Sequence, residues 1–374
     1  MRETLFVELG ERRYPIHIGQ NCLYLLGQAL REHAPAARLL VVSDNRVHEL
    51  YGEAVLSALS ESGFLVESLV IPEGEKFKTI DSCLSIWNYM LANNFTRESV
   101  VIALGGGVVG DIAGFAAAAY MRGVPYVQVP TTLLAMVDSS VGGKTGVNHP
   151  LGKNMIGAFH QPRLVFVDLG CLATLSREEF RAGFAEVIKY GVIRDAEFFA
   201  FCETERQAIF DLNPKALRHV VKTSCAIKAD VVAADELEGG LRAILNFGHT
   251  IGHAVESLTN YSLLKHGEAV AIGMVAAGRI AVRLGRFDEA EQRRLERLIE
   301  AAGLPVRIPA RLDGEDLIER LRKDKKARRG EVRFVLPEAI GRVCIESNVP
   351  PTVLRDVLDG LRDTIRARPA EHPA

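Results

Sequence analysis

Apolar residues in the first half of the chain gather into short, β-branched runs, and segments with a helical pattern separate these runs. In Glu49–Ser62 and Thr79–Asn93, apolar residues recur three and four positions apart, the spacing of a helix with one core-facing side. Strands that alternate with helices predict a mostly parallel α/β sheet. The runs that we expect to form strands are Leu39–Ser43, Phe64–Ile71, Val100–Leu104, Val124–Val129 and Leu164–Val167.

After Ser176 the strand pattern almost disappears. Ser176 with Glu179 fits a capping box that opens a helix. One hairpin-like stretch, Gly330–Leu336 with Gly341–Ile345, interrupts the later helices. We therefore expect an α/β domain over residues 1–175 and a mainly α-helical domain over residues 176–374. The helices predicted there are Arg177–Ile193, Glu197–Ile209, Lys215–Ala234, His249–Thr259, Glu268–Leu284, Glu289–Ala302, Gly314–Lys325 and Pro351–Arg368.

The composition is that of an ordinary globular protein of 374 residues, with 48% hydrophobic and 25% charged residues. Its 45 Lys and Arg residues nearly balance its 47 Asp and Glu residues, which argues against a dedicated nucleic-acid binder. No uncharged run reaches the ~18–20 residues that cross a bilayer, and the first residues lack the features of a signal peptide. Six cysteines without a CxxC pair fit a reducing cytoplasm.

A glycine-rich segment follows the strand predicted at Val100–Leu104. Gly105, Gly107 and Gly110 satisfy GxGxxG, in which backbone N–H groups and a helix N-terminus can approach a pyrophosphate. The segment does not follow the first strand, and no acid lies ~20 residues later, as the usual dinucleotide fingerprint requires. Asp44 ends an earlier strand and offers a carboxylate for a ribose. The alternative is a turn that packs a helix on a sheet.

Two histidines, His249 and His253, stand four residues apart, so a helix places both on one face, where they can bind one metal ion. Threonine rather than glutamate follows the first, which excludes the zinc-protease motif. The sequence leaves the third ligand open between His266, Glu256 and Glu186. Three protein ligands would leave a coordination position for substrate. Two unrelated helical histidines are the alternative.

Several cationic residues lie among small or apolar neighbours. Lys189 and Lys228 occur in apolar helical segments, and Arg242 lies four residues before Asn246. Each lysine taken alone is more often a snorkelling side chain. Together they indicate a polyanionic substrate, because Arg suits a carboxylate and Lys a phosphate. Lys144, in a Gly-Gly-Lys-Thr-Gly loop, does not have the spacing of a P-loop.

Arg320–Arg329 is the one strongly basic run. No aromatic residue interleaves with its charges, so base stacking on single-stranded nucleic acid is not expected. A solvated helix end is the ordinary interpretation of such a run. An RNA-binding patch and a lid that reaches a phosphate are the alternatives.

The motifs as a set resemble the 3-dehydroquinate synthase family of sugar-phosphate cyclases. They follow the family's order from about residue 40 to residue 336, although the glycine segment and HxxxH also recur in metal-dependent alcohol dehydrogenases. The residues that carry the resemblance are Pro72–Lys78, Gly105–Asp111, Pro130–Thr132, Asp138–Lys144, Lys153 and Asn154, Glu186–Lys189, Arg242–His253, His266–Glu268 and Asp324–Lys326.

The resemblance implies a Rossmann-like NAD⁺-binding domain, a helical metal-binding domain, an active site in the cleft between them, and a homodimer. It assigns a Zn²⁺ or Co²⁺ ion to Glu186, His249 and His266, and it leaves Glu256 a structural role. The implied NAD⁺ contacts are Asp44, Glu75, Lys78, Gly107, Val108, Val109, Gly110, Asp111, Thr131, Thr132, Lys144, Lys153, Cys171, Leu172, Ala173 and Thr174. The implied substrate-facing residues are Asp138, Lys144, Asn154, Lys189, Lys228, Arg242, Asn246, His253 and Lys325, although the sequence does not separate Lys325 from Lys326.

The family's substrate is 3-deoxy-D-arabino-heptulosonate 7-phosphate (DAHP), and its products are 3-dehydroquinate and phosphate. The implied sequence is oxidation at C5 by NAD⁺, phosphate elimination, re-reduction, ring opening and an intramolecular aldol closure, so NAD⁺ is regenerated. The leaving phosphate would accept the C6 proton. Lys144, Asn154 and Lys325 would hold phosphate, Arg242 and Lys228 carboxylate.

Three rival functions are considered. Another sugar-phosphate cyclase would act on a substrate without a carboxylate, which leaves Arg242 and Lys228 unexplained. A metal-dependent polyol or alcohol dehydrogenase would need fewer cationic residues and would accumulate NADH. A nucleic-acid binder that uses the basic run Arg320–Arg329 would bind in a strongly salt-dependent way.

Overall fold

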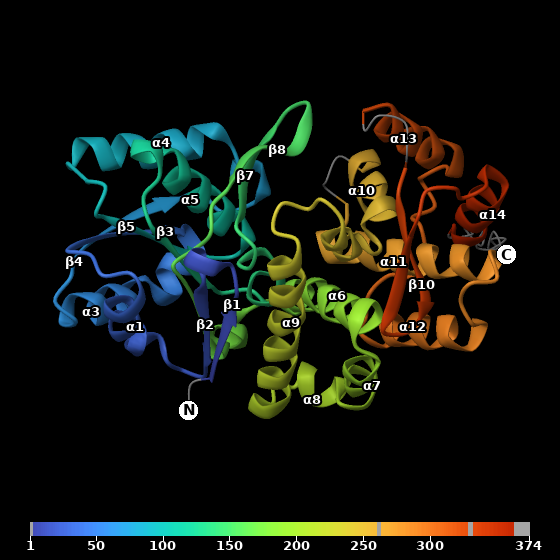
Figure 1. The fold of residues 1–374 in the computed structure, drawn as a ribbon, viewed down its shortest axis with the longest axis horizontal. Coiled ribbons are helices and arrows are strands. Elements are labelled where there is room, and N and C mark those ends of the chain that lie inside the picture. Colours follow the sequence, from blue (N-terminus) through green and yellow to red (C-terminus); the bar gives the residue numbers. More distant parts are fainter. Residues whose placement is uncertain (1–2, 260–262, 328–331, 363–374) are drawn as a thin grey trace, which may run out of the picture. The chain divides into compact units, whose positions relative to one another are not determined.

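The structure is a computed structural model that describes residues 3–259, 263–327 and 332–362, with residues 324–327 described by their backbone alone (Figure 1). Its contacts divide the chain into two units. Unit 1 comprises Met1–Val187 and Thr204–Arg242, and unit 2 comprises Ile188–Glu203 and Ala243–Ala374. Helix α6 (Arg177–Arg194) begins in unit 1 and continues without interruption into unit 2. The predicted domain ranges are continuous, whereas these units are segmented, and the domain boundary stays a prediction.

Unit 1 is built on a seven-stranded sheet with the order β1-β2-β9-β6-β5-β3-β4. Only β1 and β2 pair antiparallel, and the other neighbouring strands run parallel, which confirms the expected α/β class. All five strands predicted from the apolar runs are present. The strands are β1 (Glu3–Val7), β2 (Tyr14–Gly19), β3 (Arg38–Asp44), β4 (Leu65–Ile71), β5 (Val100–Gly105), β6 (Tyr126–Pro130) and β9 (Leu164–Asp168).

Both faces of this sheet are covered. Leu39 and Val41 of β3 belong to one buried cluster, while Leu40 and Val42 belong to another, as alternation along a strand requires. A strand that is buried on both faces is apolar at nearly every position, and this is why β3 could be predicted from its apolar run. The helices of unit 1 are α1 (Leu26–His33), α2 (Asn45–Val47), α3 (Glu53–Glu61), α4 (Ile80–Ala92), α5 (Gly107–Ala119), α8 (Arg206–Phe210) and α9 (Pro214–Ala234).

A two-stranded antiparallel hairpin, β7 (Lys144–His149) with β8 (Gly152–Phe159), also belongs to unit 1. The sequence pattern predicts a polar, glycine-rich loop there instead. The strands β1 and β2 and the helix α1 were not predicted. One helix was predicted over Glu49–Ser62, where a π-helical turn at His48–Gly52 precedes α3. The edge strand β1 and the polar hairpin carry little apolar signal, since they bury little side-chain surface of their own.

Unit 2 is mainly helical, as predicted, and it contains the expected hairpin. The segment Glu197–Ile209, predicted as one helix, forms two, α7 in this unit and α8 in unit 1. The helix predicted over Pro351–Arg368 ends at Leu361, and residues 363–374 lie outside the described part. No helix among the described residues is long and apolar enough to span a membrane. Its elements are α7 (Ala196–Thr204), α10 (His249–Leu258), α11 (His266–Arg283), α12 (Glu289–Ala301), α13 (Gly314–Ala327), α14 (Pro351–Leu361), β10 (Phe334–Ala339) and β11 (Arg342–Glu346).

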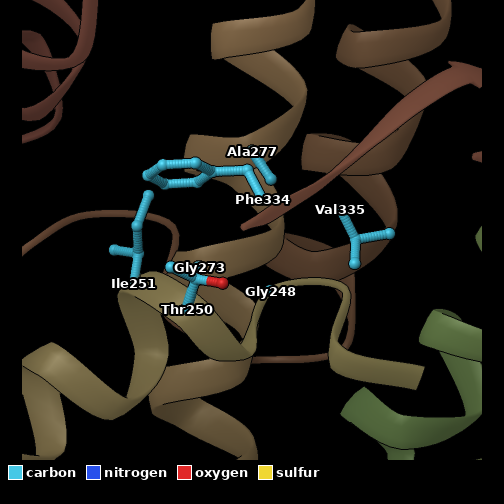
Figure 2. A pocket seen from close by; sticks show the side chains of 7 residues that line it. All are labelled: Gly248, Thr250, Ile251, Gly273, Ala277, Phe334 and Val335. Carbon is cyan, nitrogen blue, oxygen red and sulfur yellow. The ribbon is translucent and has the colours of Figure 1, made fainter. Parts of the chain in front are cut away.

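The start of α10 lies very close to α11. Gly248, the residue before α10, has a φ of +80°, and a Cβ there would lie 2.7 Å from the Val270 carbonyl oxygen and 2.6 Å from Met274 Cγ. A Cβ on Gly273 of α11 would lie 1.8 Å from the Gly248 carbonyl oxygen. Figure 2 shows this junction from the side of the small apolar pocket that Ile251 and Phe334 also line. Two glycines therefore set the distance between the helices that carry the histidines.

Candidate active site

The residues expected to contact a nucleotide lie in unit 1, where five parallel strands end. Asp44 is the last residue of β3, and the β3–β5 register places Ser43 beside Leu104, so these strands end at the same level. The carboxyl ends of parallel strands form the edge at which α/β sheets bind ligands. The other segments that follow these strands hold Glu75 and Lys78 after β4, Gly107–Asp111 after β5, Thr131 and Thr132 after β6, and Cys171–Thr174 after β9.

The glycine segment needs its glycines for packing. A Cβ on Gly105 would lie 2.7 Å from Val109, one on Gly107 would lie 2.9 Å from the Ser139 hydroxyl, and one on Gly110 would lie 2.7 Å from Gln128. At the same time, Gly106 caps α5 without a side-chain hydrogen bond, so the first N–H groups of the helix face no capping side chain. The segment thus fits both interpretations, a packed turn and a phosphate cradle, and the two are compatible.

Lys78 lies at the centre of a buried polar cluster. The residue is 4% exposed, and its ammonium group donates to Asp111 and, over 2.6 Å, to Asn154 Oδ1. Burial acts to lower the pKa of Lys78, but the charges of Asp111 and Glu75 outweigh it and raise that pKa, so the side chain stays cationic. The structure thus brings together three predicted site residues from the β4–α4 turn, α5 and the β7–β8 hairpin.

The β7–β8 hairpin is tied to the same turn by a second set of contacts. Asn148 Nδ2 donates to Glu75 Oε1 over 2.8 Å, and Lys153 Nζ lies 3.8 Å from the same oxygen. Asn154 has a φ of +56°, and its N–H donates to Asn148 Oδ1 over 2.9 Å. Asn148 was missed by the sequence analysis, because an isolated asparagine carries no motif. Its contacts make it the residue that shapes the hairpin tip.

Other predicted nucleotide contacts also hold local structure. Asp44 accepts the Val47 N–H over 2.8 Å as the cap of α2, and burial raises its pKa. Thr132 Oγ1 accepts the Ala135 N–H over 3.1 Å. The Cys171 carbonyl accepts a hydrogen bond from Thr174 Oγ1 over 3.2 Å. Val108 and Val109 lie in the first turn of α5, and Leu172 and Ala173 lie in the 3₁₀ turn after β9. Lys144 faces outward and forms an ion pair with Glu238.

A second cluster in unit 1 joins Lys228, Asp138 and Arg242 to the Gly142 turn. Lys228, which is 6% exposed, donates from Nζ to both Asp138 Oδ1 and the Asp138 carbonyl oxygen over 2.6 Å. Arg242 is 1% exposed, and its Nη2 donates to the Gly142 carbonyl over 3.0 Å. Gly142 has a φ of +98°, and a Cβ there would lie 2.5 Å from Arg242 Nη2. The two cations proposed from the sequence as carboxylate ligands are thus both buried and oriented.

Tyr14 completes this cluster, and the sequence carried no sign of it. Its hydroxyl accepts the Gly142 N–H over 3.1 Å, and its ring is 1% exposed. Burial raises the pKa of Tyr14, so the phenol stays neutral. Burial also lowers the pKa of Arg242, against the charges of Glu238 and Asp138, but a guanidinium is so strong a base that it remains protonated at neutral pH.

In unit 2 the three histidines gather where α10 and α11 begin. The ring centroids lie 5.3 Å apart for His249 and His253, 5.3 Å for His249 and His266, and 6.1 Å for His253 and His266. His249 and His266 are the first residues of their helices. The close approach at Gly248 therefore brings together imidazoles that are far apart along the chain.

Hydrogen bonds at Nδ1 orient two of these rings. His249 Nδ1 donates to the Phe247 carbonyl over 3.1 Å, which places the hydrogen on Nδ1 and leaves the Nε2 lone pair for a ligand. His266 Nδ1 lies 3.4 Å from both carboxylate oxygens of Glu256, whose side chain is 3% exposed. Protein carboxylates and carbonyls orient metal-binding histidines in this way. The donor set fits a divalent metal ion.

The electrostatics around His249 favour its neutral, ligating form. Burial lowers the pKa of His249 well below 6.5, and the charges of Lys189, His253 and His266 lower it further. Lys189 is itself 1% exposed, and its Nζ lies 5.0 Å from the centroid of the Tyr190 ring. A neutral imidazole is the form that binds a metal.

The remaining predicted residues lie on several elements. Glu186 is fully buried on α6, one helical turn before Lys189, and Asn246 ends the 3₁₀ segment Leu241–Asn246. The side chain of Lys325, and that of its alternative Lys326, lie outside the described residues. Thus the candidate phosphate ligand of α13 is not part of the geometry above.

Two family models match adjoining parts of the chain. Residues 68–182 match the N-terminal model of 3-dehydroquinate synthase, and residues 183–327 match its C-terminal model. The sequence is also 51% identical to the 3-dehydroquinate synthase of Nostoc punctiforme, over 96% of this chain and 100% of that protein. The chain belongs to the 3-dehydroquinate synthase family.

Solved structures of related cyclases have the same fold. The 2-epi-5-epi-valiolone synthase of Streptomyces hygroscopicus, solved with NAD⁺ and Zn²⁺, is 32% identical with a TM-score of 0.86, over 93% of this chain and 96% of that one. A 2-deoxy-scyllo-inosose synthase, solved with carbaglucose-6-phosphate, NAD⁺ and Co²⁺, is 27% identical with a TM-score of 0.85, over 95% of this chain and 99% of that one. Membership of the 3-dehydroquinate synthase family confirms the resemblance seen in the sequence motifs.

Proposed function

We propose that this chain carries out the reaction of its family, the conversion of DAHP into 3-dehydroquinate and phosphate. The observation that carries the proposal is the 51% identity to a 3-dehydroquinate synthase along nearly the whole chain. The buried cations Lys228 and Arg242 also support it, because they can bind a substrate carboxylate in addition to Lys228's existing ion pair with Asp138. The enzyme is therefore a carbon–oxygen lyase of the shikimate pathway.

Glu186, His249 and His266 hold the divalent metal ion in this proposal, either Zn²⁺ or Co²⁺. Each offers a ligand atom, and the two histidines begin α10 and α11 of unit 2. His253, Glu256 and His266, which all belong to unit 2, form a second group whose ligand atoms lie within 4.8 Å of one another. The contact of Glu256 with His266 Nδ1 favours a positioning role for this carboxylate and leaves the exposed His253 for the substrate.

The residues at the carboxyl ends of the strands of unit 1 would hold NAD⁺, and the backbone N–H groups at the start of α5 would hold its pyrophosphate. The glycines there and the absence of a capping side chain at Gly106 support this assignment. Asp44 contacts the adenosine ribose, and Lys78 holds the turn and the β7–β8 hairpin around the nucleotide. The residues of the 3₁₀ turn after β9 and Thr131 and Thr132 complete the binding edge.

The metal ion and NAD⁺, when bound, supply Lewis-acid activation of the C5 hydroxyl and a reversible acceptor for its hydride. The chain's own residues bind and orient the substrate. Arg242 and Lys228 hold the carboxylate, and Asp138 keeps the Lys228 ammonium group in place. Lys144, Asn154 and Lys325 hold the phosphate. Asn246, Lys189 and His253 contact hydroxyls, and His253 exchanges protons with them.

We also propose that the enzyme is a cytoplasmic homodimer. Support for the compartment comes from the cysteines, because none of the six forms a disulfide and five of them are buried. The dimer rests on the family resemblance alone. Sedimentation of the purified protein tests it, and a monomer at micromolar concentration would contradict it.

The reaction is tested with purified, metal-loaded protein, DAHP and a catalytic amount of NAD⁺. We expect one phosphate per DAHP consumed and no net absorbance from NADH. NADH formed in proportion to the substrate would contradict the proposal and indicate a dehydrogenase. Glucose 6-phosphate, which has no carboxylate, is the matched control, and its turnover in place of DAHP would indicate another sugar-phosphate cyclase.

A further inference from the structure

A second group of metal-ligating side chains lies in unit 1, outside every residue assigned to the active site. His17 belongs to β2, and Glu32 and His33 end α1. Each offers one ligand atom, and the three atoms lie within 4.8 Å of one another. The ring centroids of His17 and His33 are 5.1 Å apart. Two segments that do not adjoin in sequence thus converge with two imidazoles and a carboxylate.

Neighbouring side chains orient the members of this group. The Thr4 hydroxyl lies 2.9 Å from His17 Nδ1, and the tautomer with its hydrogen on Nδ1 donates to that hydroxyl and leaves Nε2 as the ligand atom. Gln28 Nε2 donates to Glu32 Oε1 over 3.1 Å, and the other carboxylate oxygen lies 3.8 Å from His33 Nε2. In protein metal sites, neighbouring residues commonly form such hydrogen bonds with the metal-ligating side chains and hold them in orientation.

We propose that His17, Glu32 and His33 bind a second divalent transition-metal ion, with Zn²⁺ as the best match and a water molecule in the fourth position. Two nitrogens and one carboxylate oxygen are a common zinc donor set. Tetrahedral bonds of ~2.1 Å separate ligand atoms by about 3.4 Å. The group, at up to 4.8 Å, therefore contracts by at most about 1.4 Å on binding.

The burial of the three side chains suits such a contraction. His17 is 4% exposed and packs edge-on against Phe166, so it is a fixed ligand. Glu32 is exposed and His33 is half-buried, so both can rotate toward it and the ion can enter from solvent. An ion pair between the neighbours Glu32 and His33 is the simpler interpretation. That pair alone does not account for His17, which approaches the two residues of α1 from strand β2.

A metal ion here would join α1 to β2, the strand that pairs with both the edge strand β1 and the parallel strand β9. The role is structural, since none of the three residues is among those assigned to substrate or NAD⁺. The inference does not depend on the proposed reaction.

The test counts zinc in the full-length protein after dialysis against buffered micromolar Zn²⁺. We expect two equivalents in the wild type and one in His33→Ala, with the same loss in Glu32→Gln. His249→Ala should also hold one equivalent, and the double variant with His33→Ala none. His219→Ala changes an exposed histidine of α9 that belongs to neither group, and it should keep both equivalents.

A second readout uses Co²⁺ as the probe, because its visible absorption reports coordination. The difference spectrum between wild type and His33→Ala should show one tetrahedral Co²⁺, and Zn²⁺ should raise the melting temperature of His249→Ala but not that of the double variant. Equal metal content in wild type and His33→Ala would overturn the second site. If only the active-site assignment is wrong, the difference of one equivalent between those two proteins remains.

Discussion

Glu256→Gln tests how the metal site is built. In the structure Glu256 is 2% exposed, and both of its carboxylate oxygens lie 3.4 Å from His266 Nδ1. The amide preserves the shape of the side chain but removes the charge, and its nitrogen can face the ring as a competing donor. His266 then loses the partner that fixes its tautomer and raises the basicity of its Nε2.

Loss of such an orienting partner costs about 10- to 100-fold in metal affinity, or about 1.4–2.7 kcal/mol. We therefore expect Glu256→Gln to bind Zn²⁺ about 10- to 100-fold more weakly in a competition with a chromogenic chelator. Activity should return when the metal concentration is raised to saturation. Glu300→Gln, which alters an exposed glutamate of α12, is the matched control and should bind like the wild type.

Two results would refute this reasoning. An unchanged zinc affinity would show that Glu256 does not act on His266. Complete loss of zinc in Glu256→Gln, together with normal binding in Glu186→Gln, would make Glu256 a direct ligand in the alternative group with His253. In that case Glu186 would not hold the metal ion.

Three further predictions concern the surroundings of the site. Arg242→Ala removes a buried guanidinium and should cost ~1.5–3 kcal/mol of binding free energy, which raises KM for DAHP about 10- to 150-fold. Arg242→Lys should recover part of this loss, and an unchanged KM and kcat in Arg242→Ala would reject the role. Gly248→Ala places a Cβ 2.6 Å from Met274 Cγ at a residue with a φ of +80°. The variant should lose ~1–3 kcal/mol of unfolding free energy in denaturant titrations. An unaltered denaturant midpoint would contradict the close approach of the two helices. The pKa of His249 is lowered from 6.5, so stability of the metal-free protein is present above pH 6.5 and is lost as the pH falls toward the folded pKa. Lys189→Met removes a cause of the lowering, so acid should destabilise this variant less steeply in unfolding titrations, and an identical pH profile would contradict the coupling.

Local patterns accounted for much of the fold. The strand at Val100–Leu104 was predictable because a strand buried on both faces has no polar position, and α9 and α12 because a core-facing helix repeats its apolar residues. β2 was missed because Pro15 and His17 break its apolar run, although every one of its residues is buried. The side chains of Pro15 and His17 are buried by residues that are distant in sequence. A pattern read over a few neighbouring positions does not include those residues.

The candidate site divides in the same way. The glycine segment and the two histidines of α10 were recognisable because one helix or one turn presents each group, so spacing alone conveys the geometry. The contact between Glu256 and His266 was not recognisable in the sequence. It depends on the packing of α10 against α11 and on the orientation of the His266 ring, whose Nδ1 faces the carboxylate.

The sequence by itself determined the α/β and helical character of the chain and its family, and it indicated candidate residues for a metal ion, a nucleotide and an anion, because these follow from periodicity and local motifs. Only the tertiary structure decided which of these residues have their partners in place. Gly142 is hydrogen-bonded to Arg242 and to Tyr14, which lie 100 and 128 residues away along the chain. The grouping of His17 with Glu32 and His33 joins a strand to a helix. Such contacts arise when distant segments pack together, and packing is a property of the whole unit.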